Sequence, residues 1–125
     1  TENIVYYIQD ENVGEVFVPG TDWNTKAGNS IVFGVQVAKM GMYDIIITMK
    51  SELGELAQLP VSVYLDNQLK TTVSVRGTQG AVVTEIRDLG MIFGSHHYIK
   101  LYFGASGLAI EHVKISLREE FKMPF

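Results

Sequence analysis

Apolar and polar residues alternate with a period of two along most of this chain, and this pattern constrains the fold more than any other feature. The clearest runs are residues 61–65, 99–103 and 113–117, where Val, Ile, Leu or Phe occupies every second position. Successive side chains of a β-strand point to opposite faces of the sheet. Each run therefore predicts a strand with one buried face.

Turn-forming residues, above all the 12 glycines, separate these runs. Short strands at this spacing predict an all-β fold, an antiparallel β-sandwich or jelly roll, as a single domain over residues 1–125. Residues 51–57 fit either about two turns of helix or a plain loop. The nine expected strands lie near residues 3–9, 14–18, 30–37, 42–50, 61–66, 69–75, 81–87, 97–103 and 109–118.

Charge and composition exclude several classes of function. The net charge is −4 and the ten Lys and Arg residues are scattered, whereas nucleic-acid binding needs a clustered basic surface. No apolar stretch approaches the ~20 residues of a membrane span. The lack of cysteine excludes disulfides and thiolate chemistry. No catalytic motif stands out, so we expect no nucleic-acid partner, no membrane partner and no enzyme activity.

Trp23 is the only tryptophan, and it lies in the polar stretch of residues 19–28. An indole in such a stretch either closes one end of the core or offers its face to a ligand. Sugar rings stack their CH faces on aromatic rings, while their hydroxyls need amide and carboxylate partners. Asp22, Asn24 and Lys26 would supply those partners, and the residues alone leave both alternatives open.

A second group of aromatic residues is expected on a sheet face. Tyr64 and Tyr102 alternate with apolar positions and should point outward, with Gln36 and Lys100 as polar neighbours. They form either a patch that binds a ligand or isolated exposed tyrosines, which are common because tyrosine favours strands.

Glu111 is an anomalous acid, because it shares the parity of the apolar positions in its strand. An ionised carboxylate that faces the interior needs a partner or a cation. Gln9 and Glu11 share one parity near the first strand, so the three side chains converge if the first and last strands lie close. Oxygen ligands of this kind suit calcium. Alternatively, Glu111 lies at a strand end and turns to water.

Three regions of the chain together resemble the carbohydrate-binding modules of families 6 and 35, which have a galactose-binding-like jelly roll. The first region resembles their polar-start strand followed by a Gly-x-Tyr strand, and the second resembles a strand that ends in an Asp-Gly turn. The third resembles their two closing strands. The regions are 29–37 (NSIVFGVQV) with 39–47 (KMGMYDIII), then 61–67 (VSVYLDN), then 89–101 (LGMIFGSHHYIKL) with 107–115 (GLAIEHVKI). Together they span nearly the whole chain.

The resemblance implies two kinds of site. A structural calcium would be held at the positions of Gln9, Glu11 and Glu111, and Gln9 in place of an acid should weaken it. A sugar site would lie in the loops at one end of the sandwich, where Trp23 matches one of two expected aromatic rings. The second ring is missing near Gly80, and Ala109 stands near the expected asparagine. The arrangements left are a loop site to which Gln79, Arg76 or Asn24 contributes, and a sheet-face site with Tyr64 and Tyr102.

The function that the resemblance implies is that of a secreted, non-catalytic carbohydrate-binding module. Such a module would target an appended glycoside hydrolase to plant cell-wall polysaccharide, a β-glycan, through aromatic stacking and hydrogen bonds. A catalytic domain in the same parent chain would then be its partner. The alternative is a structural or protein-interaction β-sandwich module of a multidomain secreted enzyme.

Overall fold

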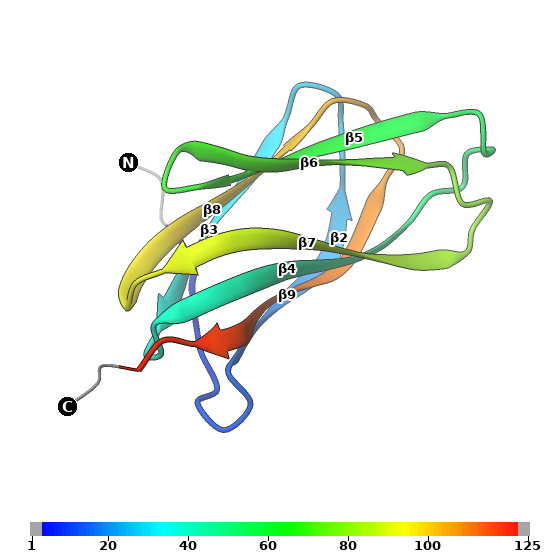
Figure 1. Ribbon diagram of the computed structural model, residues 1–125. Coiled ribbons are helices and arrows are strands. Elements are labelled where there is room, and N and C mark those ends of the chain that lie inside the picture. The colour runs from blue at the N-terminus through cyan, green and yellow to red at the C-terminus, as the bar shows by residue number, and fades with distance from the viewer. Residues whose placement is uncertain (1–3, 123–125) are drawn as a thin grey trace.

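The computed structural model describes residues 4–122, except for the side chains of Thr21, Asp22 and Asn24. All nine expected strands are present, and this part of the chain contains no helix (Figure 1). The strands are β1 (Tyr6–Ile8), β2 (Glu15–Asn24), β3 (Ser30–Val37), β4 (Gly41–Lys50), β5 (Gln58–Leu65), β6 (Gln68–Arg76), β7 (Val82–Ile92), β8 (Ser95–Phe103) and β9 (Ala109–Glu120).

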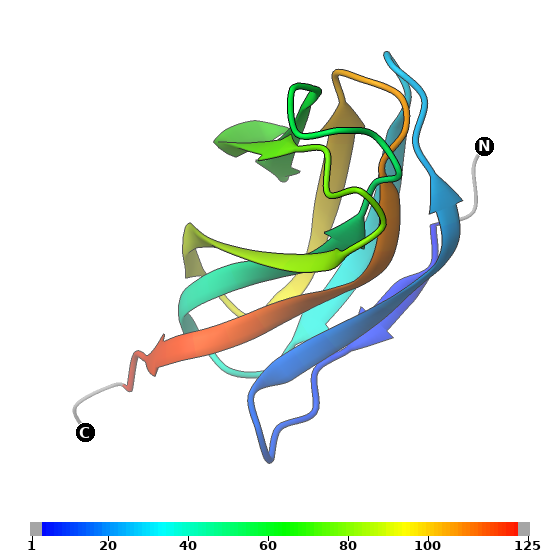
Figure 2. The same cartoon turned by 90° about the vertical axis from the view of Figure 1, so that its right-hand side faces the viewer.

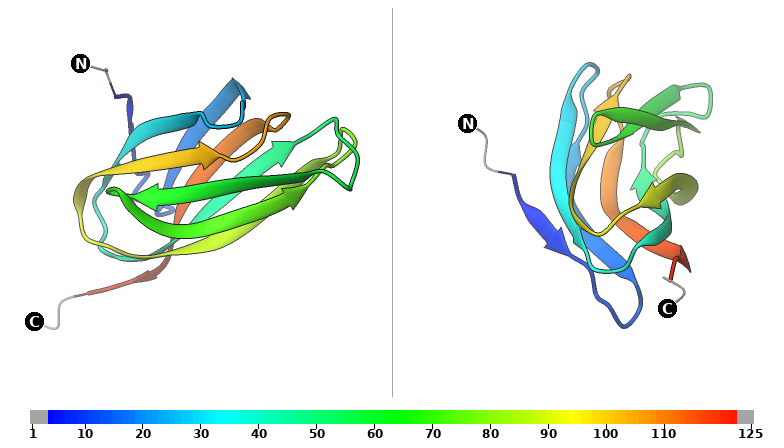
Figure 3. Two further views of the ribbon diagram at one scale, coloured as in Figure 1. Left: turned by 90° about the horizontal axis from the view of Figure 1, so that it is seen from above. Right: turned by 60° about the vertical axis from the view of Figure 1, so that its left-hand side comes forward.

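The strands form two sheets that face each other as the two layers of a sandwich (Figure 2). The five-stranded sheet has the order β1-β3-β8-β5-β6, and the four-stranded sheet has the order β2-β9-β4-β7. Neighbouring strands are antiparallel, apart from the parallel pair of β1 and β3 at one sheet edge (Figure 3). The predicted all-β sandwich is therefore confirmed.

One apolar core fills the space between the sheets. The alternating positions of the runs that predicted the strands all turn inward, and Val61, Val63, Ile99 and Leu101 are completely buried. Tyr43 and Phe33 are among the largest side chains of this core. Each such side chain contributes about 1.5–3 kcal/mol by leaving water.

The second strand is longer than expected, because β2 continues from Val18 to Asn24. Its pairing with β9 is interrupted between Pro19 and Trp23 and then resumes. Pro19 is tolerated because β2 is an edge strand. Gly20 lets the two backbones approach, since a Cβ atom there would lie 2.5 Å from the carbonyl oxygen of Ile110. Part of the polar stretch around Trp23 is thus strand.

Residues 51–57 form turns, so the loop alternative holds and the helix alternative is wrong. The hydroxyl of Ser51 accepts a hydrogen bond from the backbone N–H of Leu53 at 3.1 Å, and the backbone N–H of Ser51 donates to the Thr78 hydroxyl at 2.9 Å. The Ser51–Thr78 bond ties the loop after β4 to the turn between β6 and β7. Loops at this end of the sandwich are therefore held together by hydrogen bonds.

Candidate functional site

Four of the six tyrosines lie on the outer face of the five-stranded sheet. They are Tyr6 on β1, Tyr64 on β5, and Tyr98 and Tyr102 on β8. Their neighbours along the strands, such as Ile99 and Leu101, are buried, so alternation directs the tyrosines outward. Tyr6, Tyr98 and Tyr102 are each about two-fifths exposed. We call these four residues, together with Lys100, the tyrosine face.

One corner of the tyrosine face is an ordered cluster around Tyr6. The Tyr6 hydroxyl donates a hydrogen bond to the Tyr98 hydroxyl at 2.9 Å, and this bond raises the pKa of Tyr6. The ring of His96 meets Tyr6 edge-on, with 5.2 Å between centroids. Gly34 of β3 lies beneath Tyr6, and a Cβ atom there would come within 2.4 Å of its ring. Glycine is therefore needed at this position for the ring to lie across β3.

The centre of the tyrosine face combines a cation with aromatic rings and hydroxyl groups. Lys100 pairs with Tyr64 across β8 and β5, and its Nζ atom lies 4.4 Å above the centre of the Tyr64 ring. Tyr102 lies opposite Ser62, whose hydroxyl is 3.3 Å from that of Thr72. Rings flanked by hydroxyl and ammonium groups match the two faces of a sugar, its apolar CH surface and its polar rim.

Trp23 packs mainly against the core. It is half-buried and stacks on Phe33 of β3, with 6.1 Å between centroids and 24° between ring planes. This placement favours the first of the two alternatives for Trp23, a ring that closes one end of the core. The side chains of Asp22 and Asn24, the expected polar partners, lie outside the described residues.

Replacing Trp23 with alanine should therefore act first on stability. We expect Trp23→Ala to lower the free energy of unfolding by about 2 kcal/mol, because it removes a large ring that is packed on one side. Denaturant unfolding measures this loss, with the exposed Phe17→Ala as a control that should change stability by about 0.5 kcal/mol or less. A Trp23→Ala variant as stable as the wild type would contradict the packing role.

Arg76 and Gln79 lie near the end loops but take different positions. Arg76 ends β6 and lines a shallow hollow of about 340 Å³ with Val83 and Glu85 of β7. Gln79 lies in the β6–β7 turn with a φ of 54°, and its backbone N–H donates to the carbonyl of Leu53 at 3.0 Å. Among the described residues, no hydrogen bond or ion pair joins either side chain to another polar group. The structure therefore does not group Arg76 or Gln79 with other candidate sugar-binding residues.

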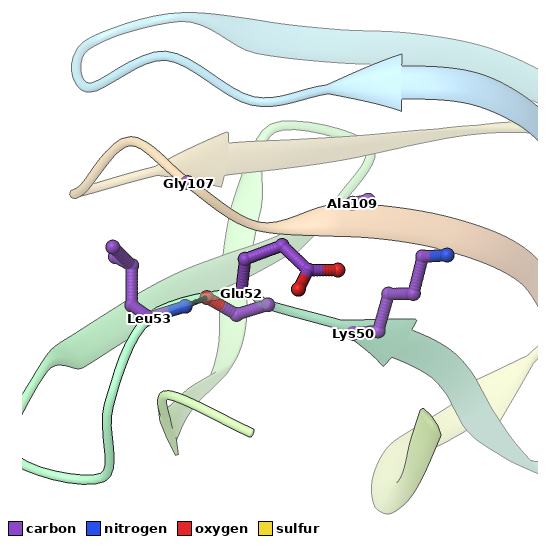
Figure 4. Close-up of a pocket in the computed structure, with 6 residues that line it drawn as sticks. Lys50, Glu52, Leu53, Gly107 and Ala109 are labelled. Atoms are coloured by element: carbon purple, nitrogen blue, oxygen red, sulfur yellow. Dashed lines mark hydrogen bonds between the residues drawn. The ribbon is translucent and has the colours of Figure 1, made fainter. Parts of the chain in front are cut away.

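A second hollow, of about 330 Å³, lies between the end loops (Figure 4). We call it the end-loop hollow, and its lining residues are Lys50, Ser51, Glu52, Leu53, Gly107 and Ala109. The Lys50 ammonium pairs with the Glu111 carboxylate at 3.7 Å. No aromatic ring is among these lining residues, and Ala109 contributes no side-chain amide. The end-loop hollow thus lacks a stacking platform.

Gln9 is buried, and protein groups satisfy its side-chain amide. Its Nε2 atom donates to the Tyr43 hydroxyl at 2.7 Å, while its Oε1 atom accepts from the backbone N–H groups of Ala38 and Lys39 at 2.9 and 3.1 Å. The Tyr43 hydroxyl in turn donates to the Lys39 carbonyl. Burial raises the pKa of Tyr43, so this hydroxyl keeps its proton. We call these groups the Gln9 network.

Glu111 does not face the interior, contrary to its parity. His112 pairs with Thr48 and Ile110 pairs with Met49, so Glu111 is the extra residue of a β-bulge in β9. A bulge shifts the alternation by one position. The Glu111 side chain is consequently 40% exposed and turns toward Lys50.

The three expected calcium ligands do not come together. Glu11 is exposed in the turn after β1, where Asp10 pairs with Glu15. Glu15 pairs with Ser116, five positions along β9 from Glu111, which corresponds to about 16 Å of strand. No group of three or more His, Asp or Glu side chains suited to a metal occurs among the described residues. The predicted ligand set does not fit a shared ion, and calcium binding stays a prediction of the resemblance.

Thermal unfolding with added calcium or with EDTA tests that prediction. A site occupied at a hundred times its Kd would stabilise the fold by about 2.7 kcal/mol, which raises Tm by roughly 10 °C in a domain of this size. From the placement of the three residues we expect the two unfolding curves to coincide. A Tm rise of that order with calcium would show that the chain assembles a site in another way.

Several known proteins are similar to the chain in sequence or in structure. No family model matches it. A β-glucosidase of Ruminococcus albus is 29% identical over 100 residues, which make up 80% of this chain and 11% of that protein. A β-glucosidase from Paenibacillus barengoltzii superposes with a TM-score of 0.70 at 22% identity, over 92% of this chain and 11% of that one. This chain thus spans about a tenth of either enzyme.

A second similar structure is a single module. It is the C-terminal family 6 carbohydrate-binding module of a laminarinase from Zobellia galactanivorans, with a TM-score of 0.68 at 14% identity, over 82% of this chain and 98% of the module. The chain has the fold of carbohydrate-binding modules. Modules of families 35 and 36 share this fold as well. The resemblance stated from the sequence is thereby confirmed at the level of the fold.

Sequence reasoning missed Tyr6 and Tyr98 of the tyrosine face. Tyr98 shares the parity of Lys100 and Tyr102, so the alternation of β8 already indicated its direction. Tyr6 could not be placed this way, because its position depends on the parallel pairing of β1 with β3. Gly34 in the middle of a strand was the available signal, since glycine there often marks a close approach by another group.

Proposed function

We propose that this chain is a non-catalytic carbohydrate-binding module that holds polysaccharide on the tyrosine face. The observation that carries this proposal is the gathering of four tyrosines on one open sheet face, three of them with exposed rings. Sugar CH faces stack on such rings, and hydroxyl groups beside them supply hydrogen bonds. An open face of this kind suits an extended chain of sugars better than a single one. Affinity should be modest, because ordering a flexible ligand offsets part of the contact energy.

The module is proposed as an accessory domain of a secreted glycoside hydrolase that acts on plant cell-wall β-glycan. Support comes from the two β-glucosidases, in which a segment of similar sequence or fold is about a tenth of a long chain. Holding an attached catalytic domain near its substrate raises the effective concentration of that substrate. Extracellular polysaccharide is the ligand that such an arrangement serves.

The acid–base groups of a glycosidase do not meet on the tyrosine face. Glycoside hydrolysis generally requires two carboxyl groups about 5–9.5 Å apart across the sugar. The five strands of this sheet carry no Asp or Glu. A sugar held on this face would therefore be bound without being cleaved.

No helix long and apolar enough to cross a bilayer occurs in residues 4–122.

Affinity electrophoresis of the isolated domain tests the proposal. Gels that contain a soluble mixed-linkage β-glucan, xylan, mannan or polygalacturonate should retard the wild-type protein in at least one case. A protein that does not bind carbohydrate and has a similar net charge provides the reference mobility. If the wild-type protein is retarded no more than the reference protein in every gel, the result would contradict carbohydrate binding and favour the alternative function.

That alternative is a structural or protein-interaction module. The observations that favour it are the lack of an aromatic ring in the end-loop hollow and the exposed apolar residues on the outer face of the four-stranded sheet. Phe17 and Ile86 are each more than half exposed there. Failure to bind any glycan, together with self-association or association with a neighbouring domain through Phe17, would support this function.

A further inference from the structure

Acidic residues are distributed unequally between the two sheets. None of the chain's 14 acidic residues lies in the strands of the five-stranded sheet, which carry Lys70, Arg76 and Lys100. The strands of the four-stranded sheet hold eight acids against four Lys or Arg residues. Those acids are Glu15, Asp22, Asp44, Glu85, Asp88, Glu111, Glu119 and Glu120. The net charge of −4 thus belongs mainly to one side of the sandwich.

Lys100 lies at the centre of the tyrosine face. Its strand neighbours on the same face are Tyr98 and Tyr102, and its ammonium group is held over the Tyr64 ring. A cation over an aromatic ring is attracted to that ring, which orients it without neutralising its charge. None of the ion pairs found among the described residues includes Lys100. Its charge is therefore available to a ligand.

One carboxylate lies beside this face, and other protein groups engage it. Asp66 in the β5–β6 turn accepts a hydrogen bond from the backbone N–H of Tyr98 at 2.9 Å, and its second oxygen lies 2.6 Å from Nδ1 of His97. Acids of the opposite sheet act from a greater distance, since packed sheets lie about 10 Å apart. The Debye length is also about 10 Å at moderate salt, so their repulsion at the tyrosine face is largely screened.

We infer that the tyrosine face takes an anionic polysaccharide, one whose sugar rings carry carboxylate or sulfate groups. This inference rests on the proposed function and names the ligand class of the same site. The rings of Tyr98 and Tyr102 stack on the sugars, while Lys100 pairs with an anionic substituent between them. The strands around Lys100 carry no acid, and the carboxylate beside them, Asp66, is engaged by the Tyr98 N–H and by His97, which limits the like charge that such a ligand would meet.

Calorimetric titration with a matched pair of ligands tests the inference. Carboxymethyl cellulose and methyl cellulose share a β-linked glucan backbone, and only the first carries carboxylates. At about 0.1 M salt the wild type should bind the carboxylated chain about fivefold more tightly, because an exposed ion pair with Lys100 contributes modestly. Lys100→Met keeps most of the length of the side chain, removes its charge, and should reduce that preference to about twofold or less. Lys114→Met on the other sheet, the matched control, should leave it unchanged.

The remaining outcomes distinguish a failure of the anionic ligand from a failure of carbohydrate binding itself. Equal binding of the anionic and the neutral chain in both the carboxylate and the sulfate comparison, or an unchanged preference in Lys100→Met, would overturn the anionic ligand and leave carbohydrate binding standing. No binding to either chain, nor to any neutral glycan, would overturn both. Cellulose sulfate compared with methyl cellulose distinguishes the anion, since preference for the sulfated chain alone would assign sulfate. High salt should reduce the preference in every case where charge is responsible.

Discussion

A double variant, Tyr98→Ala with Tyr102→Ala, is expected to bind polysaccharide about 30-fold more weakly than the wild type. If each ring contributes about 1 kcal/mol by stacking on a sugar, the two together contribute about 2 kcal/mol, and 1.4 kcal/mol is tenfold in affinity. Both rings are exposed, so the variant should keep its fold. Titration with the glycan that retards the wild type gives the affinity, and thermal unfolding gives the stability.

Phe17→Ala is the matched control for this variant. Phe17 is an exposed aromatic residue on the outer face of the other sheet, next to His112. Its removal should leave the affinity within about twofold of the wild type, because surface changes away from a binding site have small effects. Wild-type affinity in the double tyrosine variant would show that the ligand does not lie on the tyrosine face, and a large loss in Phe17→Ala would place it on the four-stranded sheet.

A Gln9→Met variant should lower the free energy of unfolding by about 3 kcal/mol. Methionine fills a similar volume but loses the three hydrogen bonds of the Gln9 side chain, each worth about 1 kcal/mol. Denaturant unfolding measures the loss. Glu11→Gln is the control, since Glu11 is exposed and should change stability by about 0.5 kcal/mol or less.

A double-mutant cycle with Tyr43→Phe separates the Gln9 network from simple packing. Removing the Tyr43 hydroxyl takes away the acceptor for Gln9 and the donor to the Lys39 carbonyl. Residues that share a hydrogen-bond network show coupling of about 0.5 kcal/mol or more. Strictly additive losses in Gln9→Met and Tyr43→Phe would contradict the network, as would a neutral Gln9→Met.

The layout of strands could be derived from the sequence because alternation is a local signal. Runs such as 61–65 and 99–103 carry their burial pattern in adjacent residues, and the structure buries the positions expected. The same reasoning went wrong at Glu111, where one extra residue in β9 reverses the parity that its neighbours suggest. A bulge depends on pairing with another strand and leaves little trace in the strand's own residues.

The candidate site was harder to derive, because it is assembled from strands far apart in the chain. Tyr64 and Tyr102 were found from their own strands, whereas Tyr6 joins them only through the parallel pairing of β1 and β3. Gln9 looked like a metal ligand by its place in the sequence. Its burial beside Tyr43, which no local pattern encodes, gives it a structural role.

The most direct test is a nuclear magnetic resonance titration of the labelled domain with a soluble oligosaccharide of the bound glycan. If polysaccharide lies on the five-stranded sheet, the largest shifts will come from the ring signals of Tyr64, Tyr98 and Tyr102. The backbone signals of Glu52 and Gly107 in the end-loop hollow will stay in place. Shifts confined to the end-loop hollow, with unmoved tyrosine rings, would show that the sugar binds elsewhere.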